Sequence, residues 1–219
     1  MKLRISILFL TLVCLVISAP AFAGVIFDDG PTDGFDNGFF IDGPNPGPWN
    51  QSISNGFVAT GGGEAYALDF GVWVPSGSTL TTITWWLGTS AFAGDLGTGT
   101  VTNFTSDFMF SNSFGYDIYE IHITGMNGGT LSAGNMYWLT LGNANDSFGE
   151  QFDGWDVTNG GLGGPAICNF MQGGVNWGDC GAGGEAFTLY SKGQVPEPGS
   201  LLLLGSGLLG LAGLLRRKM

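Results

Sequence analysis

Basic residues are scarce in this chain. The 219 residues include six lysines and arginines against 18 aspartates and glutamates, so the formal net charge is −12 at pH 7. A chain this acidic repels the phosphates of nucleic acids and anionic lipid surfaces, and we expect no nucleic acid partner. The single histidine, His122, leaves one candidate base for Ser-His-Asp or Cys-His catalysis. No Gly-x-Ser-x-Gly motif presents a nucleophile.

Helical patterning is also lacking between residues 24 and 194, which show no sustained amphipathic period and no internal repeat. Runs of β-branched and aromatic residues alternate there with turns rich in Gly, Asn, Asp and Ser. All seven tryptophans lie in this region, which therefore has enough apolar surface to fold. We predict one all-β domain over 24–194, an antiparallel β-sandwich or jelly roll. The expected strands are 25–27, 65–74, 79–87, 106–110, 116–124, 136–141, 151–157 and 185–190.

Cysteine is rare as well. Of the three cysteines, Cys14 lies in the N-terminal apolar segment, which leaves Cys168 and Cys180 in the predicted domain. In an oxidising compartment such a pair favours a disulfide that closes a short Gly-rich loop. Two thiols without a nearby histidine fall short of a tetrahedral metal site.

The N-terminus has the pattern of a secretory signal peptide over residues 1–23. Lys2 and Arg4 supply the positive charge, and an apolar run from Ile5 to Ile17 follows. Ala21 and Ala23 form a small-x-small cleavage site, with Gly24 as the first mature residue. We therefore expect the chain to be exported through the inner membrane.

The C-terminal residues 195–219 have the pattern of a second export signal. Pro196, Glu197 and Pro198 precede an uncharged apolar run, Leu201 to Leu215, which predicts a transmembrane helix. As a helix of about 15 residues this run covers roughly 22 Å, less than the ~30 Å hydrocarbon core, so a transient anchor is favoured. The terminal cluster is a membrane stop that stays cytoplasmic: Arg216, Arg217 and Lys218.

This order of tripeptide, apolar run and basic end resembles the PEP-CTERM sorting signal of Gram-negative bacteria. The resemblance covers about 25 of the 219 residues. It implies processing by an exosortase, a membrane cysteine transpeptidase-like enzyme. It also implies a host that makes exopolysaccharide, and a product displayed at the cell surface or in the extracellular matrix.

A looser resemblance concerns the outer domain. Four segments follow one another in the same order as in a common outer domain of PEP-CTERM proteins. They are an early segment at 35–38, an aromatic strand at 83–86, a central segment at 116–119 and a closing strand at 185–190. That domain is lectin-like in outline. It has no established catalytic residues, so none are transferred to this chain.

The predicted domain is more acidic than the whole chain, because its 17 carboxylates face one lysine, for a net charge of −16. This charge suits calcium, a cationic partner or solubility in an extracellular matrix. Asp28, Asp29, Asp33 and Asp36 crowd a Gly-rich segment and are candidate calcium ligands, although their spacing differs from an EF-hand loop. Asx turns are the alternative interpretation of this cluster.

Aromatic residues suggest how the domain could contact a glycan. Trp155 and Trp177 lie in Gly-, Asn- and Asp-rich stretches typical of loops, where an exposed indole can stack on a sugar ring. The alternative is that they belong to the core. Adjacent Trp85 and Trp86 must point to opposite faces of one strand.

Three functions remain open from the sequence. The first is a non-enzymatic surface or matrix protein that binds exopolysaccharide, and it is the one we favour. The second is a secreted carbohydrate-active hydrolase, although no Glu-x-Asp-x-Glu strand is present. The third is a structural coat protein bridged by calcium, the sole cofactor considered. His122 and Glu120 are expected on the solvated face of a strand, opposite Ile121 and Ile123.

Overall fold

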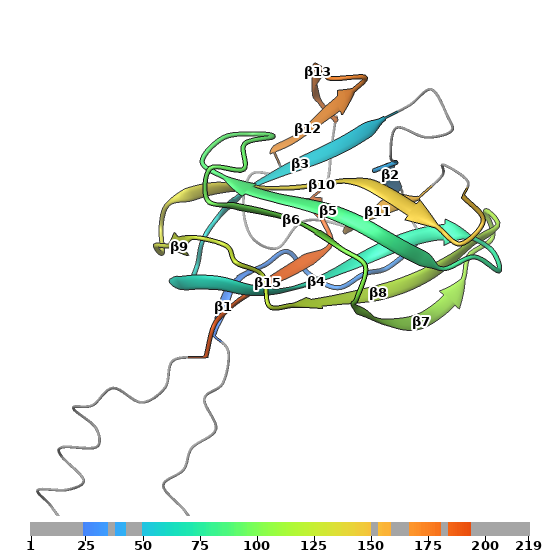
Figure 1. Cartoon of the computed structure of the whole chain (residues 1–219), viewed down its shortest axis with the longest axis horizontal. Coiled ribbons are helices and arrows are strands. Elements are labelled where there is room, and N and C mark those ends of the chain that lie inside the picture. The colour runs from blue at the N-terminus through green and yellow to red at the C-terminus, as the bar shows by residue number, and fades with distance from the viewer. Residues whose placement is uncertain are drawn as a thin grey trace, which may run out of the picture. The chain divides into compact units, whose positions relative to one another are not determined.

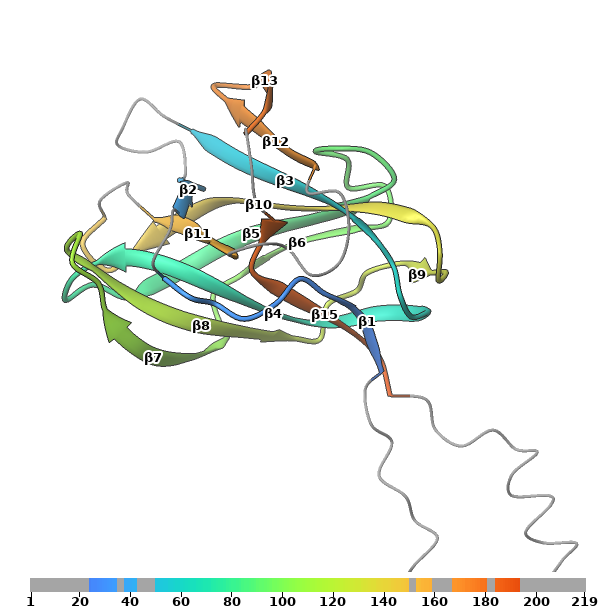
Figure 2. The same cartoon turned by 180° about the vertical axis from the view of Figure 1, so that it is seen from behind.

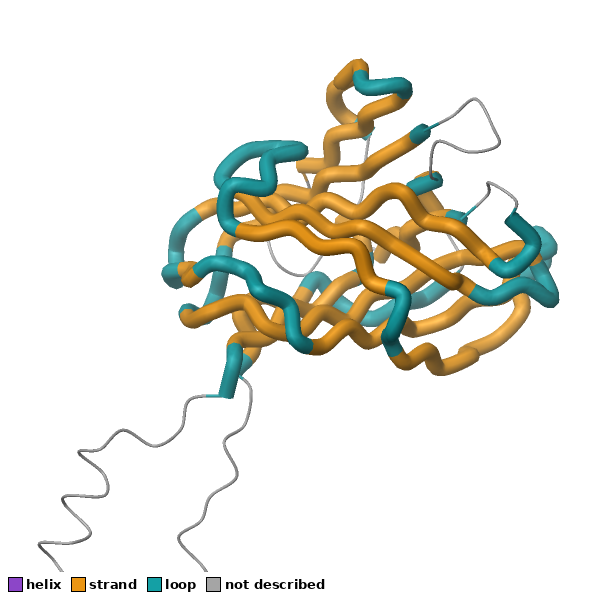
Figure 3. The backbone as a smooth tube through the Cα atoms, viewed as in Figure 1, coloured by secondary structure: helices purple, strands orange, loops and turns teal. Residues whose placement is uncertain are grey.

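The computed structural model describes residues 24–34, 38–42, 50–149, 153–158, 167–180 and 184–193. In these residues every regular element is a β-strand (Figure 3). All of the strand pairings are antiparallel, and Gly24–Lys192 form one compact unit. The predicted all-β, antiparallel class is confirmed.

The strands form two sheets that lie as two layers (Figures 1 and 2). The larger sheet has a main path of β1 (Val25–Asp28), β15 (Phe187–Ser191), β4 (Gly63–Pro75), β11 (Gly154–Thr158) and β14 (Gly184–Glu185). It also contains β2 (Gly38–Phe40), β7 (Thr105–Ser111), β8 (Tyr116–Thr124) and β9 (Thr130–Leu131). The smaller sheet runs in the order β13 (Val175–Asp179), β12 (Ile167–Gln172), β3 (Gln51–Val58), β10 (Met136–Asp146), β5 (Leu80–Gly88) and β6 (Gly97–Val101).

Period-2 alternation decides which side chains of the larger sheet enter the core. In β4, Leu68, Phe70 and Val72 are buried, whereas Asp69 between them is half-buried. Ile121 and Ile123 of β8 are buried, and His122 between them is half-buried. The sequence-based assignment of His122 to the solvated face is therefore confirmed.

The smaller sheet contributes the opposite wall of the core. Tyr137, Leu139 and Leu141 of β10 all face inward and are buried. Across the interface, Phe57 of β3 contacts Phe187 of β15 with ring centroids 5.6 Å apart. Because one apolar cluster joins residues of both sheets, the domain is a β-sandwich, as expected.

Several strands were not predicted. β3, β6 and the hairpin of β12 and β13 are absent from the expected set, because glycine, serine and asparagine dilute their apolar alternation. The expected strand 185–190 is divided between β14 and β15 at Ala186.

Candidate functional site

A row of polar side chains crosses the outer face of the larger sheet. Strand register places Asp28, Thr188, Asp69, His122 and Thr105 opposite one another on five neighbouring strands. The hydroxyl of Thr188 donates to Asp28 Oδ1 at 3.1 Å. His122 Nδ1 lies 2.8 Å from Asp69 Oδ1, and its Nε2 lies 3.4 Å from Asp107 Oδ2.

Carboxylates control the charge of His122 in this row. Partial burial lowers its pKa, but the hydrogen bond and charge of Asp69 and the charge of Glu120 outweigh burial, and the net pKa is raised. Since both ring nitrogens face carboxylates, the imidazole is held as part of an ion-pair network. This arrangement suits a structural role better than that of a general base.

A hollow of about 290 Å³ opens beside the row. Asp28, Asp69 and Glu120 contribute carboxylates to its lining, and Thr188 contributes a hydroxyl. The outward position of Asp69 between Leu68 and Phe70 was readable from the sequence. The meeting of the strands was not, because it depends on register between distant segments.

The three candidate calcium ligands that the structure describes do not share one place. Asp28 is exposed and also accepts from the backbone amide of Gly30 at 3.0 Å. Asp29 is 5% exposed and accepts from Asn55 Nδ2 at 3.3 Å, on the inner side of β3. The backbone amide of Asp33 donates to Asp156, and Asp36 lies outside the described residues. The proposed grouping of Asp28 with Asp29 is therefore wrong, because adjacent residues of an extended chain point to opposite sides.

Trp155 is a core residue and not a glycan contact. Its side chain is 0% exposed, and its Nε1 donates to the carbonyl of Ala186 at 3.1 Å. The ring packs on Phe187 with centroids 5.8 Å apart. The prediction for Trp155 is wrong because the Gly- and Asp-rich stretch around it forms β11, which pairs with β4 inside the larger sheet.

Trp177, by contrast, is exposed at 67%, as its predicted role requires. It lies on β13, the edge strand of the smaller sheet, and the neighbouring Val175 is 57% exposed. The hairpin of β12 and β13 stands out from its layer (Figure 1). The indole is therefore available to a flat apolar surface such as one face of a sugar ring.

A disulfide closes this hairpin at its base. Cys168 and Cys180 are bonded with Cα atoms 5.3 Å apart, which confirms the predicted pair. The backbone amide of Cys180 also donates to the carbonyl of Cys168 at 3.1 Å. A short loop closed in this way gains about 2–4 kcal/mol, mainly through restriction of the unfolded chain. The disulfide thus fixes the strand that carries Trp177.

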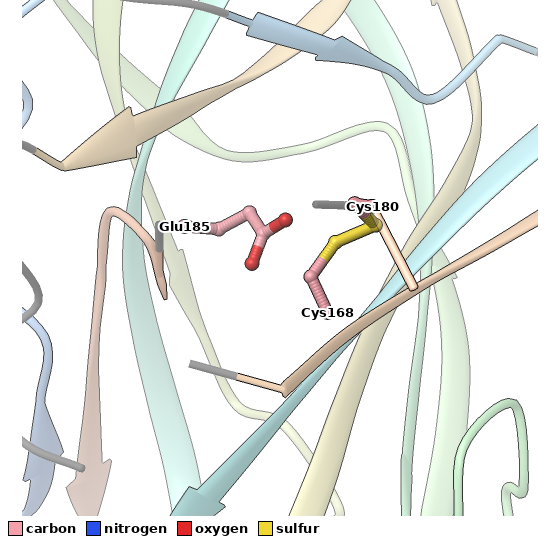
Figure 4. A group of neighbouring side chains, drawn as sticks. All are labelled: Cys168, Cys180 and Glu185. Atoms are coloured by element: carbon pink, nitrogen blue, oxygen red, sulfur yellow. A yellow bond between two sulfur atoms is a disulfide. The ribbon is translucent and has the colours of Figure 1, made fainter. Parts of the chain in front are cut away.

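Glu185 points toward the two bonded sulfurs (Figure 4). One carboxylate oxygen and the two sulfurs lie within 4.8 Å of one another. Sulfurs joined in a disulfide are not thiolates, so this trio by itself is not a soft-metal centre.

The sorting residues of both termini lie outside the described residues. These are Ala21 and Ala23 of the cleavage site, Pro196, Glu197 and Pro198 of the tripeptide, and Arg216, Arg217 and Lys218 of the basic end. In the part of the chain that the structure does describe, no helix has the length and apolarity needed to cross a membrane.

Comparison with known families decides the role of the C-terminus. A sequence model of the PEP-CTERM protein-sorting motif matches residues 194–218. The chain carries a PEP-CTERM sorting signal. A PEP-CTERM signal directs export and makes an exosortase the processing partner of this chain, which is anchored to the membrane before cleavage.

A solved structure has a distant similarity to the chain that carries the PEP-CTERM signal. No curated protein matches the chain. A family 3a carbohydrate-binding module from the CipA scaffolding of Clostridium thermocellum is similar at 12% identity and a TM-score of 0.26. The similarity covers 64% of this chain and 98% of that one. A TM-score of this size does not establish a shared fold.

Processing at the PEP-CTERM signal is expected to depend on Glu197. The change Glu197→Ala should leave the unprocessed form in the membrane, because the tripeptide loses its one charged group. Immunoblotting of membrane and released fractions measures this accumulation. Ser200→Ala, just outside the tripeptide, is the matched control and should be processed normally. Normal processing of the Glu197→Ala variant would contradict the assignment.

Proposed function

We propose that this exosortase substrate is a non-enzymatic surface or matrix protein that binds a polysaccharide through the β12–β13 hairpin. The observation that carries the proposal is the 67% exposure of Trp177 on a strand closed by a disulfide. An exposed indole on a fixed strand loses little conformational freedom when a sugar ring covers it.

A polar side chain near the indole supports the proposal. Asp179 lies two residues after Trp177 in β13 and is exposed. Carboxylate oxygens accept hydrogen bonds from sugar hydroxyls, while the ring covers the apolar face of the sugar.

The charge of the domain points to a neutral polymer. Its only lysine, Lys192, lies 3.9 Å from Glu64, and its only histidine is held by Asp69. A polymer rich in carboxylates or sulfates would be repelled by a net charge of −16. The proposed ligand is therefore an uncharged, hydroxyl-rich polysaccharide.

Binding of the full chain to immobilised neutral and anionic polysaccharides tests the proposal. We expect retention on at least one neutral polymer and about tenfold weaker binding for Trp177→Ala, equivalent to about 1.4 kcal/mol. Phe148→Ala is the matched control, because Phe148 is also an exposed aromatic residue, at 56%. Equal binding of the Trp177→Ala variant and the wild type would overturn the proposed site.

The absence of catalysis is tested with the same polymers. The hollow beside the polar row offers the carboxylates of Asp69 and Glu120, so it is the place where hydrolysis would occur. We expect no release of reducing sugar from any polymer that the chain retains. Release that disappears in Glu120→Gln would instead assign a hydrolase.

A further inference from the structure

Three polar side chains occupy inward positions between the two sheets. Asn55 of β3 sits in the alternating row between Ile53 and Phe57 and is 1% exposed. Asp29, directly after β1, is 5% exposed, and Glu185 of β14 is 0% exposed. Positions of this kind are normally apolar, so a polar group there requires a compensating partner.

The three side chains lie in one locality. Asn55 Nδ2 is 3.3 Å from Asp29 Oδ2, and a Cβ atom added at Gly184 would overlap that same oxygen. Cys168 is the cross-strand partner of Asn55, and its sulfur lies within 4.8 Å of a Glu185 carboxylate oxygen. Figure 4 shows the Glu185 carboxylate turned toward this side of the smaller sheet.

The oxygen atoms of Asn55 and Glu185 lack protein donors among the described residues. Asn55 Oδ1 and both carboxylate oxygens of Glu185 are buried without a hydrogen-bond partner in the described part of the chain. Two buried carboxyl groups and an amide oxygen thus lie in one locality that neither basic side chain of the described residues reaches. Lys192 lies beside Glu64, and His122 lies on the outer face beside Asp69.

We infer that Asp29, Asn55 and Glu185 bind a hard divalent cation, with calcium as the best fit, between the two sheets. All three donors are oxygens, and Ca²⁺ takes roughly six to eight oxygen ligands in flexible geometry. The protein ligands are both carboxylate oxygens of Glu185, the carboxylate of Asp29 and the side-chain carbonyl oxygen of Asn55. A thiophilic metal is disfavoured because the neighbouring sulfurs are bonded to each other.

The electrostatics of the apo site agree with this assignment. Burial, together with the negative charge of Asp29, raises the pKa of Glu185 to about 8. A bound cation reverses both influences, because it replaces lost hydration and attracts the ionised form. Such an ion would join β14 of the larger sheet to β3 of the smaller one.

Terbium luminescence tests the site, with Tb³⁺ as the probe for calcium. The full chain, purified in detergent and freed of metal, is titrated with Tb³⁺ while tryptophan is excited. Trp155 is the expected sensitiser, because its indole donates a hydrogen bond to the carbonyl of Ala186, next to Glu185. We expect terbium emission that Ca²⁺ displaces, and loss of that emission in Glu185→Gln.

Two further variants make the test specific. Asp107→Asn removes a carboxylate whose side chain is 80% exposed and should keep the emission. Gly184→Ala, which displaces Asp29, should weaken Tb³⁺ binding while the glutamate remains. Emission that persists in Glu185→Gln would place the ion elsewhere and overturn the inference.

Thermal unfolding provides the second readout. Ca²⁺ should raise the unfolding temperature of the wild type and leave that of Glu185→Gln unchanged. In a chelator, Glu185→Gln should unfold no earlier than the wild type, because the amide is isosteric and buries no charge. An unfolding temperature of the wild type that is the same with and without Ca²⁺ would overturn the inference.

Discussion

At pH 8 in a chelating buffer, the protein is expected to unfold at a markedly lower temperature than at pH 5. Four buried carboxyl groups cause this difference. Burial raises the pKa of Asp153 and of Glu185 to about 8, that of Asp42 to about 7 and that of Asp156 to about 6.

Proton binding decides whether stability rises or falls with pH. In the unfolded chain these groups ionise near their usual values, 3.8 for Asp and 4.5 for Glu, whereas the folded protein keeps their protons to higher pH. Between these limits the folded state binds more protons, so stability falls as pH rises from about 4 through about 8. Each pKa unit corresponds to about 1.4 kcal/mol, and the combined loss is several kcal/mol.

Asp42 and Asp153 form the centre of this effect. The backbone amide of Asp153 donates to Asp42 Oδ1 at 2.8 Å, and the charge of Asp146 raises the pKa of both groups. Neither side-chain oxygen of Asp153 has a hydrogen-bond partner among the described residues. Ionisation of this pair therefore places like charges together in a site that water does not reach.

Urea denaturation at pH 5, 6, 7 and 8 measures how the free energy of unfolding depends on pH. The chelator is present so that a bound cation does not mask this dependence. Asp153→Asn should flatten the profile and raise stability at pH 8, because it removes one buried charge. Asp95→Asn should leave the profile as it is in the wild type, because Asp95 is exposed and its hydrogen bonds from Thr89 lower its pKa, away from this pH range. A urea midpoint at pH 8 that equals or exceeds the midpoint at pH 5 would contradict the burial of these groups.

Trp155→Ala is expected to cost about 3–5 kcal/mol of the free energy of unfolding. The side chain is fully buried against Phe187, and its removal opens a cavity between the sheets. It also leaves the carbonyl of Ala186 without the indole donor. The loss approaches the whole stability of a small domain.

Chemical denaturation of the two tryptophan variants checks this assignment directly. Trp177→Ala should change the free energy of unfolding by no more than about 0.5 kcal/mol, because its ring is exposed. In polysaccharide binding the order is expected to reverse, because Trp177 is the proposed contact and its removal should weaken binding. If Trp155→Ala were tolerated, its placement in the core would be wrong.

Where alternation was regular, side-chain placement could be predicted from the sequence. The prediction that Trp85 and Trp86 face opposite sides of β5 is confirmed, since Trp85 is 2% exposed and Trp86 is half-buried. His122 and Glu120 lie on the solvated face for the same reason. Local geometry suffices here, because successive residues of a strand point to opposite faces.

The placement of the acidic residues could not be predicted in this way. Acidity favoured a solvated domain, yet seven carboxyl groups are buried: Asp29, Asp42, Asp117, Asp146, Asp153, Asp156 and Glu185. Several of them follow or precede short strands, where period-2 alternation gives no direction. Trp155 was misplaced for a related reason, since its glycine-rich surroundings resemble a loop and form a strand only through pairing with β4.

The sequence by itself determined that this protein is exported and processed by an exosortase, because a sorting signal is read as a linear order of tripeptide, apolar run and basic end. It also determined the all-β class and the cysteine pair, which depend on local patterning and on compartment. Only the tertiary structure decided which acids and tryptophans are buried and which side chains meet. Register and the packing of two sheets bring together Asp29, Asn55 and Glu185 from distant parts of the chain, and no local pattern encodes that meeting.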